Sequence, residues 1–501
     1  MPVYRFGVFC LDTDAYRLTR AGDPAAASPR QLDLLAYLAA RPSQLVTREA
    51  LFQALWPDVI VTDNALTQLV SELRQTLGDS SGSPEYVQTV ARRGYRFIAS
   101  VVPVDSPGAD PVSESNVRER RGRETSNLDA LRAATEGRLQ LEALDSARVE
   151  PAIENFDRAI SLDPSFSAAY VGRANARFWL YERSRSGYRP DSALLAAAVS
   201  DARRGIELAP EFAEAHATLA YLLTAAARAD EARAAAREAI ALEPKHWSHH
   251  FRLGHAAWGA ERLGALRRCL QLYPAFPFAH FQMAMVHVAR QELDTASRVL
   301  EEGIAVLEGT DATRSRFPAS GLYWLRGSIR LTRDDLDGAL ADFECELQGS
   351  DSTLYASEFS VAALNSRGFA LVRAARPKEA EEAFRRSLAA HQEQARVHLG
   401  LAVVAGGRQQ PDSEAVALAQ ADDAIDHLGR GSRTVEAALM AAGKMVVEQQ
   451  LDEAAGMLDR FLTEMPPGAA GWSIPIDPLF RSLGQIPTFG HVLDRLTWRA
   501  E

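Results

Sequence analysis

Residues 63–77 read DNALTQLVSELRQTL. Leucine and valine recur in this stretch at intervals of three and four residues, which is the period of one face of an α-helix. The apolar positions are Leu66, Leu69, Val70, Leu73 and Leu77. The pattern therefore predicts an amphipathic helix from about Asp63 to Leu77, with its apolar stripe turned toward a core.

The opposite face of this predicted helix carries side chains that can form hydrogen bonds. Its candidate contact residues are Asn64, Thr67, Gln68, Ser71, Arg74 and Gln75. Reading of base edges in the major groove of DNA requires a polar face of this kind on a stable helix. The alternative is a solvent-exposed helix face that contacts no ligand.

A hairpin is predicted after this helix, where the chain reads YVQTVARRGYRFIA. Side chains alternate over Tyr86–Val90 and Tyr95–Ala99, as in two strands, and Gly94 permits the positive φ of a tight turn. The tip presents Arg92 and Arg93, with Arg96 close behind. Cationic side chains in this position can bind phosphate or enter a minor groove.

Further elements are predicted upstream of this helix. Alternation predicts strands at Tyr4–Phe9 and Tyr16–Thr19. One helix begins near Pro29, since proline is tolerated in a first turn. Another follows the N-cap residue Thr47 and ends at Trp56-Pro57. These elements make residues 1–103 a small α+β domain.

Three motifs carry a resemblance to a known family: REALFQALWPD at residues 48–58, SELRQTLGD at 71–79 and VQTVARRGYRF at 87–97. In this order they resemble the OmpR/PhoB-type effector domain, and the similarity covers nearly all of residues 3–100. The resemblance implies a winged helix-turn-helix domain that binds duplex DNA. It makes residues 63–77 the recognition helix and the Arg92-Arg93-Gly94 hairpin the wing.

The resemblance also suggests partners and a mode of control. RNA polymerase is a candidate partner, and a homodimer on DNA is a candidate assembly. In many proteins of this type the module follows a phosphorylated receiver domain. Here it is N-terminal, and the arrangement resembles that of the soluble invasion-gene activators, so we do not expect control by phosphorylation.

The net charge of −11 is unevenly distributed along the chain. Residues 1–103 contain ten arginines and ten acidic residues, whereas the chain from residue 128 onward accounts for a charge of −10. DNA binding therefore requires a local group of arginines rather than a basic domain. The neutral charge leaves open a winged helix that serves only for protein contact.

Cysteine usage and hydropathy predict a cytoplasmic protein. Cys10, Cys269 and Cys345 are far apart and form no CxxC pair, which is typical of a reducing compartment. No apolar run approaches the ~18 residues of a membrane helix, and the N-terminus does not resemble a signal peptide. We expect no contact with a membrane.

Residues 104–127 separate the first domain from a helical region. They lack aromatic side chains and are rich in Ser, Pro, Gly and charged residues, which predicts a flexible linker. The pattern A-x3-F-x2-A-x4-P then occurs at Ala152, Phe156, Ala159 and Pro164 and again at Ala232, Ala236, Ala239 and Pro244. Small residues twelve positions apart occur at Ala220/Ala232, Ala284/Ala296, Gly327/Ala339, Gly368/Ala380 and Ala442/Ala454.

These features resemble the tetratricopeptide repeat, whose period is about 34 residues. The resemblance covers residues 130–466 and implies an α-solenoid of eight or nine helical pairs over residues 128–466, closed by capping helices in residues 467–501. The interval from Pro164 to Pro210 exceeds the period, and we expect the extra residues, RSRSGYRPDSAL, between two helices. The interval from Pro244 to Pro274 is shorter and predicts a shortened turn.

In tetratricopeptide proteins, four positions of each first helix line the concave side. Carried over onto this sequence, these positions are Tyr221, Phe251, His255, Trp258, Phe278, Phe281, Met285 and Trp324. We expect an aromatic, largely apolar groove, and exposed apolar surface of this kind marks a binding site for a protein, a peptide or a small effector. The alternative is a groove filled by the end of the chain or by a self-contact.

One histidine cluster suggests a metal: His246, His249, His250 and His255. The fourth position of successive repeats, where a bulky side chain packs between helices, is occupied by His216, His250 and His280. We therefore expect a packing role and no metal site. The chain has no P-loop, HExxH, GxSxG or dinucleotide-binding glycine motif, so we expect neither catalysis nor a cofactor.

The sequence as a whole predicts a mostly α-helical protein, with an N-terminal α+β winged helix-turn-helix followed by an α-solenoid. The leading hypothesis is a sequence-specific DNA-binding transcriptional regulator whose solenoid binds a partner. One rival is an interaction scaffold whose winged helix does not bind DNA. Another is an unrecognised enzyme or ligand sensor, for which a convergent polar cluster in the groove would be the sign.

Overall fold

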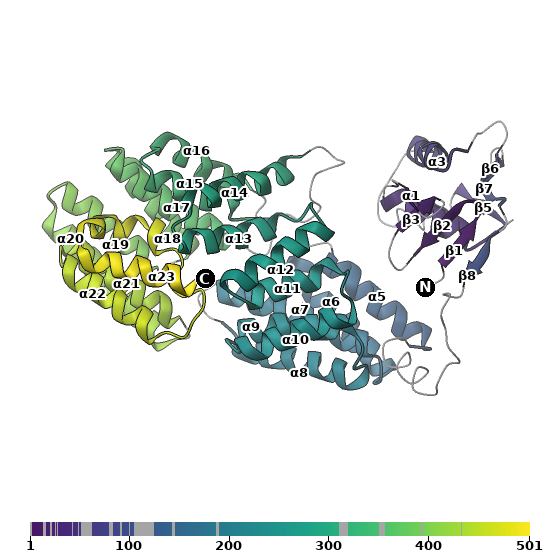
Figure 1. The fold of residues 1–501 in the computed structure, drawn as a ribbon, viewed down its shortest axis with the longest axis horizontal. Coiled ribbons are helices and arrows are strands. Elements are labelled where there is room, and N and C mark those ends of the chain that lie inside the picture. The colour runs from purple at the N-terminus through teal and green to yellow at the C-terminus, as the bar shows by residue number, and fades with distance from the viewer. Residues whose placement is uncertain are drawn as a thin grey trace. The chain divides into compact units, whose positions relative to one another are not determined.

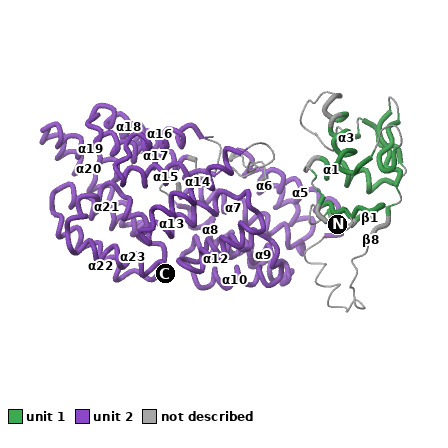
Figure 2. Tube along the Cα trace, turned by 45° about the horizontal axis from the view of Figure 1, so that its top comes forward, with its two compact units in different colours: residues 1–113 green, residues 114–501 purple. Residues whose placement is uncertain are grey.

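The computed structural model describes two compact units, formed by residues 1–113 and 114–501 (Figure 2). The described residues are 3–13, 17–20, 23–25, 27, 29–42, 44–48, 50–51, 63–79, 84–90, 93–99, 101–104, 125–142, 146–186, 190–309, 319–349, 356–391, 394–431 and 433–501. Among these residues, no helix combines the length and the apolar character needed to cross a bilayer.

The first unit begins with a five-stranded antiparallel sheet in the order β4-β3-β2-β1-β8. Its strands are β1 (Val3–Phe6), β2 (Phe9–Asp12), β3 (Arg17–Arg20), β4 (Asp23–Pro24) and β8 (Val102–Val104). The predicted single strand Tyr4–Phe9 is wrong, because Gly7 and Val8 turn the chain between β1 and β2. Gly7 has a φ of 52°, and a Cβ there would lie 2.7 Å from the Tyr86 hydroxyl, so both backbone and space require glycine.

Two described helices and a three-stranded sheet in the order β5-β7-β6 complete this unit. Their bounds are α1 (Pro29–Ala39), β5 (Leu45–Thr47), α3 (Asp63–Leu77), β6 (Val87–Val90) and β7 (Gly94–Phe97). The predicted helix of residues 63–77 is confirmed, and its five apolar positions are all buried. The Thr47 hydroxyl accepts a hydrogen bond from the Ala50 amide at 3.2 Å, as an N-cap does. The predicted end at Trp56-Pro57 lies outside the described residues.

The second unit consists of helices packed in consecutive antiparallel pairs (Figure 1). The bounds of the paired helices are α5 (Leu128–Glu142), α6 (Val149–Leu162), α7 (Ser167–Ser186), α8 (Ser192–Leu208), α9 (Ala213–Ala225), α10 (Ala229–Leu242), α11 (Trp247–Ala256), α12 (Gly259–Leu272), α13 (Pro277–Ala289), α14 (Leu293–Glu308), α15 (Leu322–Thr332), α16 (Leu336–Leu347), α17 (Ala356–Arg373), α18 (Pro377–Ala390), α19 (Ala395–Gly407), α20 (Pro411–Arg430), α21 (Thr434–Val447) and α22 (Leu451–Glu464). A single 3-10 turn, η1 (Ser146–Arg148), precedes α6. The described residues therefore contain nine pairs, which confirms the predicted solenoid.

Small residues mark the crossing of the two helices in each pair, as the spacing predicted. Gly327 and Gly368 are buried, and a Cβ on either would lie within 2.7 Å of a ring carbon of Phe343 or Phe384 from the second helix of the pair. The phenylalanine thus occupies the space that the missing side chain leaves. A larger residue at these crossings would cost about 1–3 kcal/mol through overpacking.

The long and the short repeat are built differently from what the sequence suggested. The extra residues of the long repeat were expected between helices, but α7 runs to Ser186 and α8 starts at Ser192, so most of them extend the helices. In the short repeat, α11 ends at Ala256, and the buried Arg262 donates hydrogen bonds to the carbonyls of Gly254 at 2.8 Å and Ala257 at 3.0 Å. These bonds satisfy the carbonyls at the shortened helix end.

The start of the second unit lies inside the predicted linker. Asn127 is the N-cap of α5, and its side-chain oxygen accepts hydrogen bonds from the amides of Asp129 and Ala130. The Thr125 hydroxyl donates to Asp163 at 2.5 Å. Residues 125–127 are therefore part of the helical unit rather than of a linker.

Residues 467–501, which we call the tail, contain η2 (Ile474–Ile476), η3 (Pro478–Gln485) and α23 (Pro487–Arg499). The tail was expected to cap the open end of the solenoid, with filling of the groove left as an alternative. It does pack on α22, but it also runs back to α13 and α15. A bidentate ion pair between Arg396 and the buried Asp477, with distances of 2.8 and 2.6 Å, holds it there.

Two histidines at the fourth position of their repeats, His216 and His250, fasten the turn that precedes their helix. The ring nitrogen Nε2 of His216 lies 2.8 Å from the Pro210 carbonyl, and that of His250 lies 2.9 Å from the Pro244 carbonyl. The Tyr170 hydroxyl makes the equivalent contact one repeat earlier. In these repeats, the fourth position of the first helix therefore fastens the preceding turn.

Candidate nucleic-acid interface

The outward face of α3 presents polar side chains, as the helical period predicted. Thr67, Ser71 and Gln75 are exposed, whereas the leucines of the opposite face are buried. The backbone of Asn64 and Gln68 lies in the same helix, but their side chains lie outside the described residues. The face keeps hydrogen-bonding groups at the surface of a helix that is anchored along its whole length.

Arg74 forms hydrogen bonds within the domain, whereas the sequence suggested a contact with DNA. Its guanidinium donates to the Val87 carbonyl from Nε at 3.2 Å and from Nη2 at 2.7 Å, and to the Thr89 hydroxyl at 2.8 Å. Val87 and Thr89 belong to β6, which is an edge strand of the three-stranded sheet. Arg74 therefore ties the helix to the hairpin, and the sequence could not distinguish this role from base contact.

The end of α3 is fixed by a second set of contacts. The Gly78 amide bonds to the Gln75 carbonyl and the Asp79 amide to the Arg74 carbonyl, which is a Schellman motif with glycine at a φ of 68°. The Asp79 carboxylate then accepts hydrogen bonds from the amides of residues 85, 86 and 87, at 2.7, 3.1 and 2.8 Å. Helix and hairpin thus keep a fixed relative position.

The hairpin turn is shaped by close approach of a neighbouring strand. Gly94 has a φ of 153°, and a Cβ on it would lie 2.0 Å from the Val46 carbonyl oxygen of β5. Only glycine fits there. The Arg93 side chain is exposed in the turn, Arg96 is half-buried on β7, and Arg92 lies outside the described residues.

Arg48 belongs to the same surface and was missed from the sequence. Its Nη2 lies 3.2 Å from the Thr67 hydroxyl of α3, and its amide donates to the Arg93 carbonyl in the hairpin turn. A cation between a predicted recognition helix and a predicted wing is placed to contribute to phosphate binding. Its position after a strand, outside any arginine-rich run, gave no signal in the sequence.

The predicted groove residues of the solenoid are all half-buried. Seven of the eight lie on first helices, but Trp258 lies in the turn between α11 and α12, because the short repeat lacks the last turn of its first helix. Phe251 packs edge-on against Phe276 with ring centroids 4.8 Å apart, and Phe281 against Phe359 at 5.4 Å. The aromatic side chains therefore pack largely on one another.

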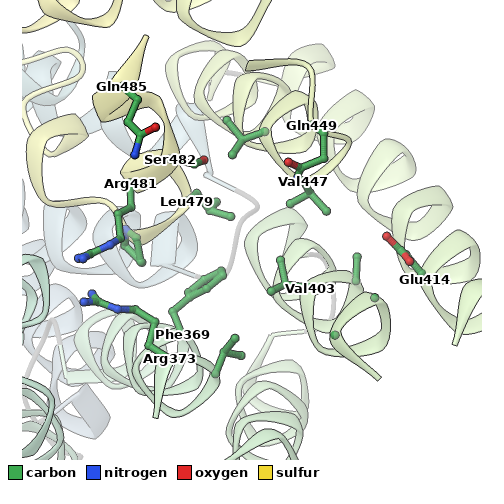
Figure 3. A pocket seen from close by; sticks show the side chains of 16 residues that line it. Phe369, Arg373, Val403, Glu414, Val447, Gln449, Leu479, Arg481, Ser482 and Gln485 are labelled. Atoms are coloured by element: carbon green, nitrogen blue, oxygen red, sulfur yellow. The ribbon is translucent and has the colours of Figure 1, made fainter. Parts of the chain in front are cut away.

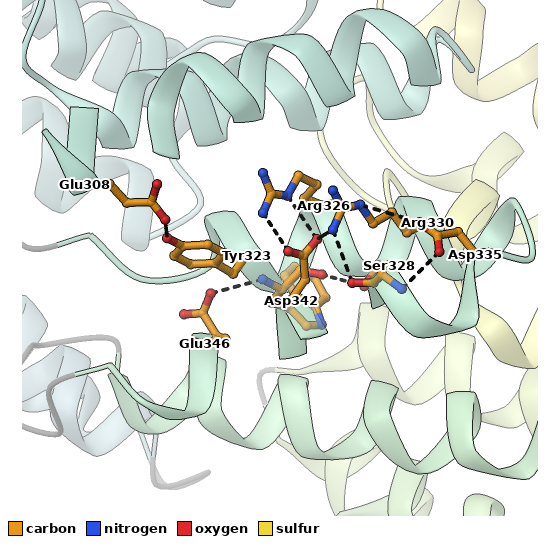
Figure 4. A network of polar contacts seen from close by, with 10 residues as sticks. Glu308, Tyr323, Arg326, Ser328, Arg330, Asp335, Asp342 and Glu346 are labelled. Carbon is orange, nitrogen blue, oxygen red and sulfur yellow. Dashed lines mark hydrogen bonds and ion pairs between the residues drawn. The ribbon is translucent and has the colours of Figure 1, made fainter. Parts of the chain in front are cut away.

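Part of this predicted groove is covered by the tail. The Trp472 ring lies against Trp324 with centroids 6.4 Å apart, and Ile476 and Ala500 belong to the same apolar cluster as Phe281. The Glu346 carboxylate lies beside the start of α15 (Figure 4) and accepts hydrogen bonds from the amides of Gly321 at 2.7 Å and Trp324 at 3.0 Å. The alternative of a groove filled by the end of the chain is therefore present for this segment.

The remaining part of the predicted groove is more polar than expected. The Nε2 atom of Gln282 lies 2.9 Å from Nδ1 of His255, and the ring of Tyr221 packs on that imidazole with centroids 4.5 Å apart. Burial lowers the pKa of His255 to about 3, and Arg262 and Arg252 add to the effect. The imidazole is consequently neutral at physiological pH and accepts a hydrogen bond from the amide.

Comparisons with known proteins give matches to the N-terminal unit. Residues 22–97 match the family model described as "Transcriptional regulatory protein, C terminal". Transcriptional activator CadC of Escherichia coli (strain K12) is 34% identical over 102 residues, 20% of this chain and 20% of CadC. The cholera toxin transcriptional activator of Vibrio cholerae is 43% identical over 74 residues, 14% of this chain and 25% of that protein.

A solved structure of the DNA-binding domain of E. coli CadC is also similar. It is 32% identical and covers 21% of this chain and 98% of that domain, with a TM-score of 0.19. This chain spans about a fifth to a quarter of the length of the two relatives. The family model lies wholly within the first compact unit.

Proposed function

We propose that this chain, whose residues 22–97 form an OmpR/PhoB-type winged helix-turn-helix domain, binds duplex DNA in a sequence-specific manner and regulates transcription. The observation that carries the proposal is the exposed polar face of α3, with Thr67, Ser71 and Gln75, on a helix fixed to the hairpin by Arg74 and Asp79. A rigid helix with a polar outer face is suited to reading the major groove.

The roles proposed for single residues follow from the helix face and the hairpin that the sequence predicts. Asn64, Gln68 and Ser71 are proposed to contact base edges, and Arg93 with its neighbour Arg92 to contact phosphate or the minor groove. Because the first domain has no net positive charge, these arginines and Arg48 supply most of the attraction to the DNA backbone.

The solenoid is proposed to bind a protein, a peptide or a small effector and to control the first domain through it. RNA polymerase and a second copy of this chain on adjacent half-sites are the further proposed partners. Repeat solenoids use their extended surfaces for binding, and Tyr221 packs in a different apolar cluster from the one that contains Ile476 and Ala500 of the tail.

The first experiment measures DNA binding by the full chain at several salt concentrations, on a randomised duplex library. Arg92→Ala/Arg93→Ala should weaken binding to all sequences and reduce the slope of log K against log salt by about 2. Gln68→Ala should change the preferred base at one position more than the affinity. Arg132→Ala/Arg430→Ala, which removes two exposed arginines of the solenoid, is the matched control and should change neither property.

The alternative is an interaction scaffold whose winged helix does not bind DNA, and the neutral charge of residues 1–103 favours it. A wild-type chain without salt-dependent binding to any duplex would contradict the regulator proposal. A salt slope that falls equally in the control would show that the hairpin arginines have no special role.

A further inference from the structure

A cavity of about 700 Å³ lies between the tail and the first helices near the end of the solenoid. Its walls come from α17, α19 and α21, from the start of α20, and from η3 of the tail (Figure 3). Small-molecule sites in proteins have volumes of about 300–1,000 Å³. The cavity is therefore large enough for a metabolite-sized ligand.

The cavity exists because small residues stand where the tail crosses the solenoid. Ala402, Gly406 and Gly407 line it from α19, and nothing lies within 4 Å of the position that a Cβ on Gly407 would take. Leu479 of η3 forms the opposite wall, and the Arg396–Asp477 ion pair holds η3 in place. The distance between α19 and η3 is thus set by the anchored tail on one side and by residues with small or no side chains on the other.

Part of the inner surface of the cavity is apolar. Val403 and Val447 extend from α19 and α21, and Phe369 from α17 closes a third side (Figure 3). Burial of an alkyl chain against such a surface is favourable because it removes apolar area from water. An apolar ligand body is consequently favoured here.

One side of the cavity carries two cations. Figure 3 shows the guanidinium groups of Arg373 and Arg481 together on one side and Glu414 on the opposite side. Arg481 lies 2.7 Å from the Asp334 carboxylate, which also pairs with Arg373. Two positive charges share one carboxylate, so this side of the cavity keeps a net positive charge.

Two further observations describe this arginine pair. Burial and the nearby Arg481 lower the pKa of the Arg373 guanidinium. The Asp334 side chain is 64% exposed, so solvent screens its charge, and a second anion at the pair would relieve the repulsion between the arginines. Glu414, in contrast, disfavours a second anionic group on the far side.

We propose that this cavity binds a small aliphatic monocarboxylic acid, with its carboxylate at Arg373 and Arg481 and its alkyl chain against Val403 and Val447. The carboxylate accepts hydrogen bonds from the two guanidinium groups, and such charge-assisted bonds are stronger than neutral ones. The ligand would contact the tail and three first helices at once, and would therefore strengthen tail docking. This inference rests on the proposal that the solenoid is a ligand-binding unit.

The test is calorimetric titration of the full chain with decanoate, decanol and decanedioate. Decanoate should bind saturably at one site per chain. Decanol should bind at least about tenfold more weakly, because it lacks the charge, and decanedioate more weakly than decanoate, because its second carboxylate meets Glu414. Absence of decanoate binding, or equal affinity for decanol or decanedioate, would overturn the assignment.

Variants of the full chain test whether decanoate binds in this cavity. Val403→Phe fills the cavity and should abolish decanoate binding, whereas Val416→Phe, the same change at an exposed valine outside the lining, should leave it unchanged. Arg481→Gln should weaken binding about tenfold, and Arg495→Gln, which breaks the Arg495–Asp459 ion pair elsewhere in the tail, should not.

Folding of each variant is checked by circular dichroism, and Val447→Phe replaces Val403→Phe if the latter does not fold. Binding that survives in a folded, filled variant would overturn the proposal, as would equal loss in the two controls.

DNA binding is measured on the same preparations. A chain that binds DNA but not decanoate refutes only this inference, and a chain that binds decanoate but not DNA refutes only the regulator proposal.

Discussion

Replacement of Arg74 by alanine should loosen the attachment of α3 to the edge strand β6. The change removes two hydrogen bonds to the Val87 carbonyl and one to the Thr89 hydroxyl. Val87 is fully buried, so its carbonyl loses a charged donor that water replaces only in part. A charge-assisted bond contributes about 1.5–3 kcal/mol, and because Arg74 is half-buried we expect a net loss of about 2 kcal/mol.

Hydrogen exchange followed by mass spectrometry on the full chain measures this loss where it occurs. A loss of that size corresponds to about 30-fold faster exchange of the amides of residues 85–90. DNA binding by Arg74→Ala should weaken alike for all sequences, with the preferred bases unchanged, because the arginine positions the helix and does not read a base.

Arg93→Ala is the matched control, since it removes an exposed arginine side chain of the same hairpin. It should leave exchange in residues 85–90 unchanged. The reasoning would be refuted if Arg74→Ala exchanged like the wild type and changed the preference at a single base pair, because Arg74 would then be a base contact.

Three other changes test the solenoid. Gly327→Val places a Cβ 2.7 Å from the Phe343 ring and should cost about 3 kcal/mol in chemical denaturation, and an unchanged midpoint would contradict the crossing argument. Asp477→Asn breaks the ion pair with Arg396, should cost about 3 kcal/mol and should expose the tail to trypsin; a wild-type cleavage pattern would count against tail anchoring. The pKa of His255 is 6.5 in the unfolded chain and about 3 in the folded protein. Between these two values the unfolded chain is protonated first, so lowering the pH over this range reduces the stability of the folded protein. His255→Gln should recover up to about 2 kcal/mol at about pH 4.5, whereas parallel pH profiles of the two proteins would show that the imidazole is not responsible.

Local patterns predicted α3 closely. The leucine spacing placed the helix at Asp63–Leu77, and Gly78 ends it in a left-handed conformation, because both features depend on neighbours within one or two turns. The twelve-residue spacing of small residues was informative for the same reason. It records a contact between two helices joined by a short turn, such as the contact of Gly368 with Phe384.

Contacts between distant segments were not predictable in this way. The turn at Gly7 and Val8 interrupts an alternating pattern without changing it, so two strands were expected as one. The pairing of β1 with β8 joins Val3 to Val104, and no local pattern records it. Arg74 has the helical phase of a DNA contact, but its hydrogen bonds to β6 depend on where a later strand lies.

The amino-acid sequence by itself determined the helices and their close crossings, because periodicity, capping and helix crossings are short-range properties. The type of the N-terminal domain and of the repeats came from the resemblance of their motifs to known families. Only the tertiary structure decided which of the predicted site residues share a surface. It placed the tail over Trp324, moved Trp258 into a turn, and opened the cavity beside Arg373 and Arg481. These outcomes depend on how a later segment packs against repeats distant in sequence, and such packing is set by the shape and charge of the assembled surface rather than by any local pattern.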